Sequence, residues 1–285
     1  MILSMTGFGK HVLQLPSKKI TIEIKSLNSK NLDLNARIPS AYREKELEMR
    51  KMIANAMVRG KVDFSLYLEF TGDDAPTSVN SGVVRRYMAQ LADISAGEEL
   101  KLMEMALRLP DATKTDREEL DPKEYVAIKE SLQAALAEII DFRTSEGAVL
   151  EADFKKRIHN LKDLLAQVVT MDPERSTSLR ERLEKAVADL KTEVDANRFE
   201  QEMIYYLEKY DITEEKVRLA NHLDYFSTTL ATADSNGKKL GFICQEIGRE
   251  INTIGSKANY APMQQLVVQM KDELEKIKEQ MLNVL

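Results

Sequence analysis

The sequence is poor in the residue types on which several common catalytic chemistries depend. It contains one cysteine, Cys244, and three histidines, His11, His159 and His222. A single cysteine excludes an internal disulfide bond and a zinc site built on cysteine thiolates. Serine-nucleophile catalysis needs a histidine base, and the sequence also lacks the motifs GxSxG, HExxH, GxxxxGK[ST] and GxGxxG after a strand. These absences argue against serine hydrolases and against enzymes that use nucleotide cofactors.

Long apolar segments are absent as well. No run of about 18 apolar residues occurs, so the sequence predicts no membrane-spanning helix. The first residues, Met1–Gly7, have neither the basic region nor the apolar core of a secretory signal, and the expected location is the cytoplasm. With 285 residues, 43% of them hydrophobic, the chain is long enough to bury a core in one large domain or two ordinary ones.

The formal net charge of -6 is distributed unevenly along the chain. Residues 1–70 carry 12 Lys and Arg against 7 Asp and Glu, a net of +5, whereas residues 71–285 carry 29 against 40, a net of -11. A basic end on an acidic body is typical of a protein that meets a polyanion with that end. Ordinary scatter of surface lysines produces the same asymmetry, so the charge pattern alone only suggests a surface for nucleic acid.

The N-terminal pattern predicts a small β-sheet with one helix packed against it. Met1–Phe8 resembles a strand, and apolar and polar residues alternate around Ile20–Lys25 and again in Arg59–Phe70. Between them, Pro39 begins a helix that extends to about Val58, where Gly60 is placed to stop it. The apolar side chains assigned to that helix and to the last strand are Leu47, Ile53, Met57, Val62, Phe64, Leu66, Leu68 and Phe70.

Helical periodicity dominates after the turn-rich segment Gly72–Thr77, so the predicted class is α+β with helix predominating. Met171–Glu174 has the pattern of a helix stop and a new start, with Pro173 in a first turn, which predicts a long antiparallel hairpin whose second arm is Leu179–Val194. Val267–Val284 repeats in the 3-4 pattern of a coiled-coil seam. The expected domains are residues 1–75, residues 76–196 with the hairpin, and residues 197–285.

The segment Asn236–Asn259 carries three stripes at helical spacing. One stripe is apolar, and a second, beside it, is polar and includes Glu246, Glu250 and Lys257. The third holds Gly241, Gly248 and Gly255, and each glycine inside a helix costs roughly 1 kcal/mol relative to alanine. We therefore expect either close approach of another backbone or a bend at the glycines. The apolar stripe consists of Leu240, Ile243, Ile247, Ile251 and Ile254.

A second helix, beginning at Asp211, has a matching polar stripe beside its apolar one. Asp211, Glu215, Arg218 and His222 lie on this stripe, next to an apolar stripe of Leu219, Leu223, Phe226 and Leu230. If the two helices pack through their apolar stripes, the polar stripes share a cleft. Carboxylates with one imidazole suit Mg²⁺ or Mn²⁺, which can activate water and stabilise a phosphoryl oxygen.

Simpler interpretations of these residues remain open. Asp211 and Glu214 can form a capping box, and the Glu246 and Arg249 pair can be an ordinary surface ion pair. His222 can be a satisfied residue at the edge of a core. Arg198, Arg249 and Lys257 could hold phosphates, although solvated helix faces have the same composition. Three helix-spaced tyrosines, Tyr205, Tyr206 and Tyr210, could stack on bases but are more typical of a core or an interface.

Several motifs together resemble the YicC/YloC-like family, in the family's order and from residue 1 to the end. In the N-terminal half these are Ser4–Gly9, Glu23–Lys30, Arg37–Pro39 and Arg59–Val62. Further along they are Arg143 with Glu146 and Gly147, Asn197–Glu202, Asp211–Glu215 through His222, Gly237–Leu240, Gln245 and Glu246, Arg249 and Glu250, Asn252 and Thr253, and Ser256 and Lys257.

The resemblance implies a metal-dependent endoribonuclease of the bacterial cytoplasm that acts on single-stranded or small structured RNA and assembles as a ring-like homo-hexamer. The conserved polar positions of that family fall on Glu202, Asp211, Glu215, His222, Glu246, Arg249, Glu250 and Lys257.

The resulting hypothesis is metal-dependent hydrolysis of RNA. Glu246, Glu250 and His222 are the expected catalytic residues; with Asp211, Glu215 and Glu202 they form the expected set of Mn²⁺ or Mg²⁺ ligands. Arg249, Lys257, Arg198, Arg59 and Lys61 are the expected contacts to RNA phosphates. Other RNA-decay proteins are conceivable partners. The alternatives are a non-catalytic RNA-binding adaptor on an oligomeric helical scaffold and, third, a purely structural helical oligomer.

Overall fold

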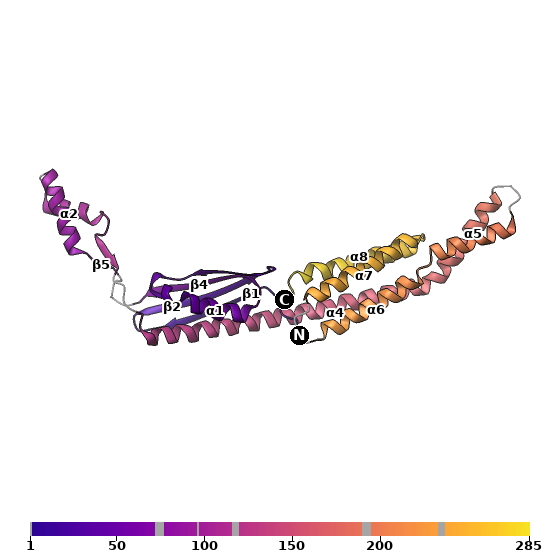
Figure 1. Cartoon of the computed structure of the whole chain (residues 1–285), viewed down its shortest axis with the longest axis horizontal. Helices are drawn as coiled ribbons and strands as arrows, with labels where there is room; N and C mark the ends of the chain where they lie inside the picture. The colour runs from indigo at the N-terminus through magenta and orange to yellow at the C-terminus, as the bar shows by residue number, and fades with distance from the viewer. Residues whose placement is uncertain (1, 72–76, 96, 116–119, 190–194, 233–236) are drawn as a thin grey trace. The chain divides into compact units, whose positions relative to one another are not determined.

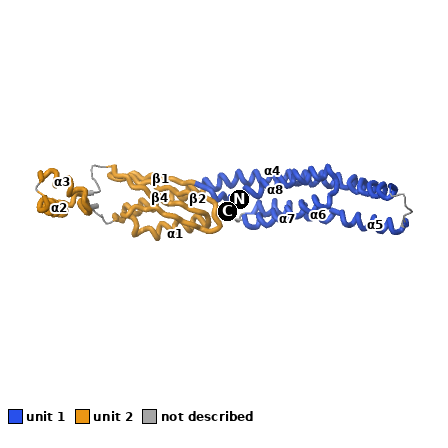
Figure 2. Tube along the Cα trace, turned by 90° about the horizontal axis from the view of Figure 1, so that it is seen from above, with its two compact units in different colours: residues 1–7, 141–285 blue, residues 8–140 orange. Residues whose placement is uncertain are grey.

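The computed structural model describes residues 2–71, 77–95, 97–115, 120–189, 195–232 and 237–285. The chain forms two compact units, which Figure 2 shows in separate colours. Unit 2 comprises residues 8–140, and unit 1 combines residues 1–7 with residues 141–285. Helices predominate and a small mixed sheet lies near the start of the chain, which confirms the predicted α+β class.

A four-stranded sheet organises unit 2 (Figure 1). Its strands, in the spatial order β1-β2-β4-β3, are β1 (Gly7–Gln14), β2 (Lys18–Leu27), β4 (Gly60–Phe70) and β3 (Leu32–Arg37). β2 runs antiparallel to β4, and β3 runs parallel to it. The alternation in β2 and β4 buries Ile20, Ile22, Ile24, Val62, Phe64 and Leu66 in one core with α1 (Glu46–Met57) and the first part of α4 (Pro122–Asp189).

Two details of the N-terminal prediction are wrong. The first strand begins at Gly7, and residues 2–6 belong to unit 1 instead. Leu47 is 67% exposed because α1, preceded by the 3-10 helix η1 (Ser40–Lys45), buries Met49, Ile53 and Met57. At 100° per residue, a side chain two positions before Met49 points away from that buried face.

A small element with its own core is inserted between β4 and α4. It consists of β5 (Thr77–Val79), α2 (Ser81–Ile94), α3 (Glu99–Leu107) and β6 (Thr113–Thr115), with β5 and β6 antiparallel. Val84, Ala106 and Ala112 are buried in it. The predicted break at Gly72–Thr77 lies outside the described residues except for Thr77, which begins β5.

The helix stop predicted at Met171–Glu174 is wrong, because α4 continues through Pro173 to Asp189. Proline lacks an N–H and costs about 3 kcal/mol inside a helix, so neighbouring contacts must offset this loss. Asp172 accepts hydrogen bonds from Arg175 Nε at 2.7 Å and from Lys216 Nζ of the adjacent helix α6 (Thr213–Leu230) at 2.6 Å. These contacts fasten the helix on both sides of Pro173.

The helix that follows α4 in the chain packs beside the end of α4. α5 (Ala196–Lys209) lies beside the end of α4, where Arg175 and Leu179 of α4 line a hollow together with Leu207 and Glu208 of α5 (Figure 1). Of the arm predicted as Leu179–Val194, the last five residues lie outside the described part of the chain.

Unit 1 packs α6, α7 (Gly237–Lys257) and α8 (Ala261–Met281) against the second part of α4. The apolar stripes predicted for α6 and α7 are buried without exception, which confirms both helices. The predicted seam at the end of the chain is mostly α8, whose Val267, Met270, Leu274 and Ile277 join the same core. Among the residues that the structure describes, no helix is both long and apolar enough to cross a membrane.

The first and last residues of the chain pair with each other in unit 1. Leu285 N donates to Leu3 O at 2.9 Å, and Met5 N donates to Asn283 O at 2.7 Å. Gly147 of α4 lies so close to Ile2 that a Cβ there would be 2.0 Å from the Ile2 carbonyl oxygen. Residues 2–5 are therefore packed and hydrogen-bonded within unit 1.

The glycine stripe of α7 has an explanation at two of its three positions. A Cβ on Gly248 would lie 3.2 Å from Leu274 Cδ2, and one on Gly255 would lie 2.9 Å from Val267 Cγ1. Both glycines admit side chains of α8, rather than another backbone, while α7 stays one continuous helix. Gly241 has no neighbour within 4 Å, and nothing in the structure explains it.

Candidate metal centre

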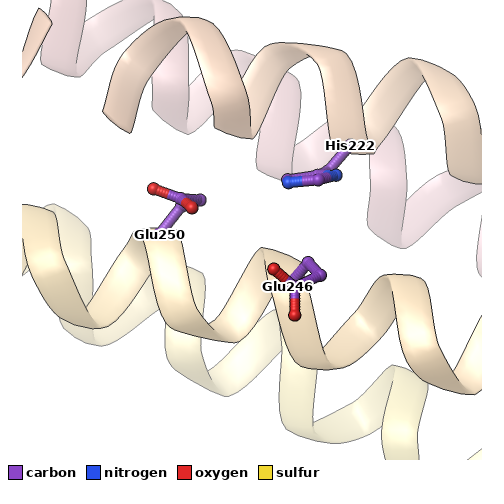
Figure 3. Close-up of side chains that lie close together, drawn as sticks. All are labelled: His222, Glu246 and Glu250. Atoms are coloured by element: carbon purple, nitrogen blue, oxygen red, sulfur yellow. The ribbon is translucent and has the colours of Figure 1, made fainter. Parts of the chain in front are cut away.

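Two neighbouring helices of unit 1 bring three potential metal ligands together. α6 and α7 pack through their buried apolar stripes, so the polar stripe of each lies beside that of the other. His222 comes from α6, and Glu246 and Glu250 come from successive turns of α7 (Figure 3). One ligand atom from each side chain lies within 4.8 Å of the other two. Their role as ligands stays a prediction.

Glu250 is the least ordinary member of this cluster. The residue is only 4% exposed, and within the described part of the chain its carboxylate forms no hydrogen bond or ion pair, although its oxygens are not among the fully buried, unpaired atoms. Leaving a buried charge without a partner is costly, because water no longer solvates it. Glu246 is half exposed and lies 3.9 Å from Arg249 Nη1, a weak surface contact. The cluster therefore has one buried and one accessible carboxylate.

The other acidic residues predicted on these helices lie in a separate group. Glu215 is 7% exposed, and its Oε1 accepts a bond of 2.8 Å from Lys257 Nζ, which also donates to the Asp211 carbonyl at 2.9 Å. The Asp211 carboxylate accepts bonds from the amide and hydroxyl of Thr213 at the start of α6. Burial raises the pKa of Asp211, but these bonds outweigh it and leave the pKa below its ordinary value. This group joins the end of α7 to the beginning of α6.

The remaining predicted residues lie elsewhere. Glu202 and Arg198 are exposed on α5, outside the three-residue cluster. Arg59 precedes β4 and is half-buried, and Lys61 is exposed on β4, both in unit 2. Two exposed aromatic residues near the cluster, Tyr225 of α6 and Phe242 of α7, were not predicted. Their spacing of three from His222 and four from Glu246 is the signal that could have identified them.

The donor set of the cluster fits a divalent cation. One imidazole nitrogen and two carboxylates match ions that prefer oxygen and accept a nitrogen ligand, such as Mn²⁺ or Mg²⁺. A cation bound there would also neutralise the buried carboxylate of Glu250. The simpler alternative is a half-buried histidine beside two unrelated acids, one of them a residue that is 4% exposed.

Comparisons with known proteins cover nearly the whole chain. The family model described as "Endoribonuclease YicC-like, N-terminal region" matches residues 2–152, and the one described as "Endoribonuclease YicC-like, C-terminal" matches residues 168–285. Two relatives, each described as "Probable endoribonuclease YicC", align over their full length and that of this chain. The protein of Clostridioides difficile (strain 630) is 31% identical over 293 residues, and that of Haemophilus influenzae is 30% identical over 292.

Proposed function

Because this chain belongs to the YicC-like endoribonucleases, a family of RNA-cleaving hydrolases, we propose that it hydrolyses RNA phosphodiester bonds at the cluster of His222, Glu246 and Glu250. The proposed substrates are single-stranded RNA and small structured RNA. The proposed cofactor is Mn²⁺ or Mg²⁺, held by the two carboxylates and the imidazole.

The observation that carries this proposal is the convergence of His222, Glu246 and Glu250, in which the Glu250 residue is only 4% exposed. Groups left in an unfavourable environment by the free protein are characteristic of functional sites, where a ligand supplies the missing interaction. A bound divalent ion supplies charge stabilisation at a phosphoryl oxygen and lowers the pKa of a coordinated water.

The side chains themselves have separable proposed roles. Glu250, which is only 4% exposed on α7, would hold the cation on the inner side of the site. Glu246 is half exposed, so its carboxylate can reach a solvent molecule and accept a proton from it during attack on phosphorus. His222, which is partly exposed, would hold the cation with one imidazole nitrogen, so only its other nitrogen could exchange a proton with the reacting groups.

The neighbouring cations are proposed to bind RNA phosphates. Arg249 is the nearest, because its guanidinium already contacts Glu246 and is 72% exposed. The Lys257 ammonium group already donates hydrogen bonds to Glu215 and to the Asp211 carbonyl. We therefore propose that it holds the end of α7 against the beginning of α6. Arg198 of α5, together with Arg59 and Lys61 of unit 2, would contact RNA phosphates that are more distant from the cleaved bond.

The proposed assembly is a homo-hexamer and the proposed location is the cytoplasm, both following from the family resemblance. Other RNA-decay proteins remain proposed partners. Sedimentation of the purified protein measures the assembly directly, and a mass near six times the 32.4 kDa of one chain is the expected result.

The metal requirement is tested on a labelled single-stranded RNA. We expect cleavage to stop in excess EDTA and to return when Mn²⁺ or Mg²⁺ is added beyond the chelator. Glu250→Gln and His222→Ala should each lower the cleavage rate by at least about 100-fold, as expected for groups that act on the reacting centre.

Glu214→Gln is the matched control, because Glu214 is an exposed carboxylate on α6, the helix of His222, and pairs there with Arg218. It should cleave at the unmodified rate. Equal cleavage with and without EDTA would remove the metal from the proposal. Unchanged cleavage by Glu250→Gln and His222→Ala would place the active site elsewhere, and RNA binding without any cleavage would favour the adaptor alternative.

A further inference from the structure

Exposed aromatic side chains flank the acidic cluster on both helices. Tyr225 of α6 is 49% exposed and Phe242 of α7 is 56% exposed. Isolated exposed apolar residues are common, but these two lie about one helical turn from His222 on α6 and from Glu246 on α7. Their position near the cluster, rather than their exposure, is therefore the reason to consider them part of a binding surface.

Helical geometry puts both aromatic residues on the solvent side of the cluster. Tyr225 follows His222 by three residues and Phe242 precedes Glu246 by four, which are angular offsets of about 60° and 40°. On each helix the aromatic side chain is rotated away from the buried stripe. The stripe of α6 lies on the other side of His222 from Tyr225, and the stripe of α7 lies on the other side of Glu246 from Phe242. The two rings therefore project at the rim of the cluster, one from each helix.

A cation connects this rim across the two helices. Lys239 Nζ of α7 lies 4.9 Å from the centroid of the Tyr225 ring on α6. Lys239 precedes Glu246 by seven residues, about two helical turns, so the two side chains lie on nearly the same side of α7. Arg249 follows Glu246 by three residues, about one turn of α7, and its side chain is 72% exposed. Aromatic rings interleaved with Lys and Arg beside carboxylates are the composition of a surface for single-stranded nucleic acid.

We propose that Tyr225 and Phe242 form a stacking platform for unpaired RNA bases next to the bond that is cut, with Lys239 and Arg249 contacting the flanking phosphates. This inference rests on the proposed function and specifies its substrate as RNA whose bases are unstacked at the cluster. Aromatic stacking accepts any base, so the platform selects single strands without selecting a sequence.

The chain contains no tryptophan, so a single introduced tryptophan reports on this surface alone. Phe242→Trp is prepared in the non-cleaving Glu250→Gln background and titrated with fluorescein-labelled single-stranded RNA. The expected result is a loss of tryptophan fluorescence that saturates at the same RNA concentration as the anisotropy of the label. Fully double-stranded RNA of the same length should bind without this loss, because its bases are already stacked.

Phe142→Trp is the matched control, since Phe142 is a 44% exposed aromatic residue on α4 outside the cluster, and its fluorescence should not change. Tyr225→Leu and Phe242→Leu should each weaken binding of single-stranded RNA by about 5-fold to 100-fold, the range for loss of one stacked base.

RNA binding without a fluorescence loss at position 242, and with unchanged affinity in both leucine variants, would overturn the platform and leave the metal-dependent cleavage intact. A lower molecular mass of Phe242→Leu in sedimentation would also overturn it, because the surface would then be a contact between subunits. Cleavage that resists EDTA would contradict the proposed function while the fluorescence loss could still be observed.

Discussion

Two buried glutamates on neighbouring helices have opposite surroundings. Glu215 of α6 is 7% exposed and pairs through Oε1 with Lys257, although its Oε2 is buried without a partner, whereas Glu250 of α7 is 4% exposed and has no ion pair among the described residues. Burial without compensation destabilises a carboxylate, and compensation by an ammonium group removes most of that cost. The same substitution should therefore change the stability of the protein in opposite directions at the two positions.

In metal-free protein, Glu250→Gln should raise the free energy of unfolding of unit 1 by about 1–2 kcal/mol. The amide removes the buried charge and keeps the shape of the side chain. Denaturant titration followed by circular dichroism measures the change.

Glu215→Gln is the paired control and should lower the free energy of unfolding by about 1–3 kcal/mol, because Lys257 loses its charged partner. Destabilisation by Glu250→Gln of the same size as by Glu215→Gln would show that Glu250 has a partner in the metal-free protein.

At the scale of the elements, α8 is joined to α4 by a hydrogen-bonded carboxylate. Glu273 of α8 accepts bonds from Asn160 at 2.9 Å and from Arg157 at 3.3 Å, and Lys276 donates to it as well. Burial raises the pKa of Glu273, but these bonds outweigh it and hold the pKa below its ordinary value of 4.5. A lowered pKa in the folded state means that the stabilisation is complete above pH 4.5 and is lost as pH falls through the lower, folded-state value.

Glu273→Gln should therefore destabilise unit 1 by about 1–2 kcal/mol at pH 7, and the difference from the unmodified protein should shrink steadily below about pH 4.5. Denaturant midpoints measured from pH 7 to pH 3 test this. Glu275→Gln, at a 61% exposed carboxylate on the same helix, should have little effect at any pH. A penalty for Glu273→Gln that is independent of pH would assign it to packing rather than to charge.

Elements whose evidence is local were predictable from the sequence, and elements decided by distant residues were not. The stripes of α6 and α7 repeat within single helices, so periodicity placed His222, Glu246 and Glu250 correctly relative to each core. Pro173 is a strong local stop signal, but Lys216, more than forty residues away, helps to hold the helix through it. Residues 2–6 have the composition of a strand, yet their partners are Arg143 and the end of the chain.

At the scale of the whole molecule, the two units have separate cores and share one continuous helix, α4. The proposed metal ligands all lie in unit 1. A ligand that binds only the folded state stabilises the region that forms its site, by about 2.7 kcal/mol at 100 times its dissociation constant.

Saturating Mn²⁺ should accordingly slow amide hydrogen exchange in α6 and α7 and leave β2 and β4 of unit 2 unchanged. Exchange followed by mass spectrometry resolves these segments. The Glu250→Gln variant should lose the protection in α6 and α7. Equal slowing in both units, or protection that persists in Glu250→Gln, would contradict a metal site at this cluster.

The pairing of Leu3 with Leu285 and of Met5 with Asn283 sets an order of events during synthesis on the ribosome. Unit 2 has all of its residues once position 140 has left the exit tunnel, so it can fold while translation continues. The segment at residues 2–6 must wait for its partners until the last residues of the sequence have emerged. A chain that lacks residues 283–285 would therefore carry a finished unit 2 and an unfinished unit 1, the unit that holds the proposed metal ligands.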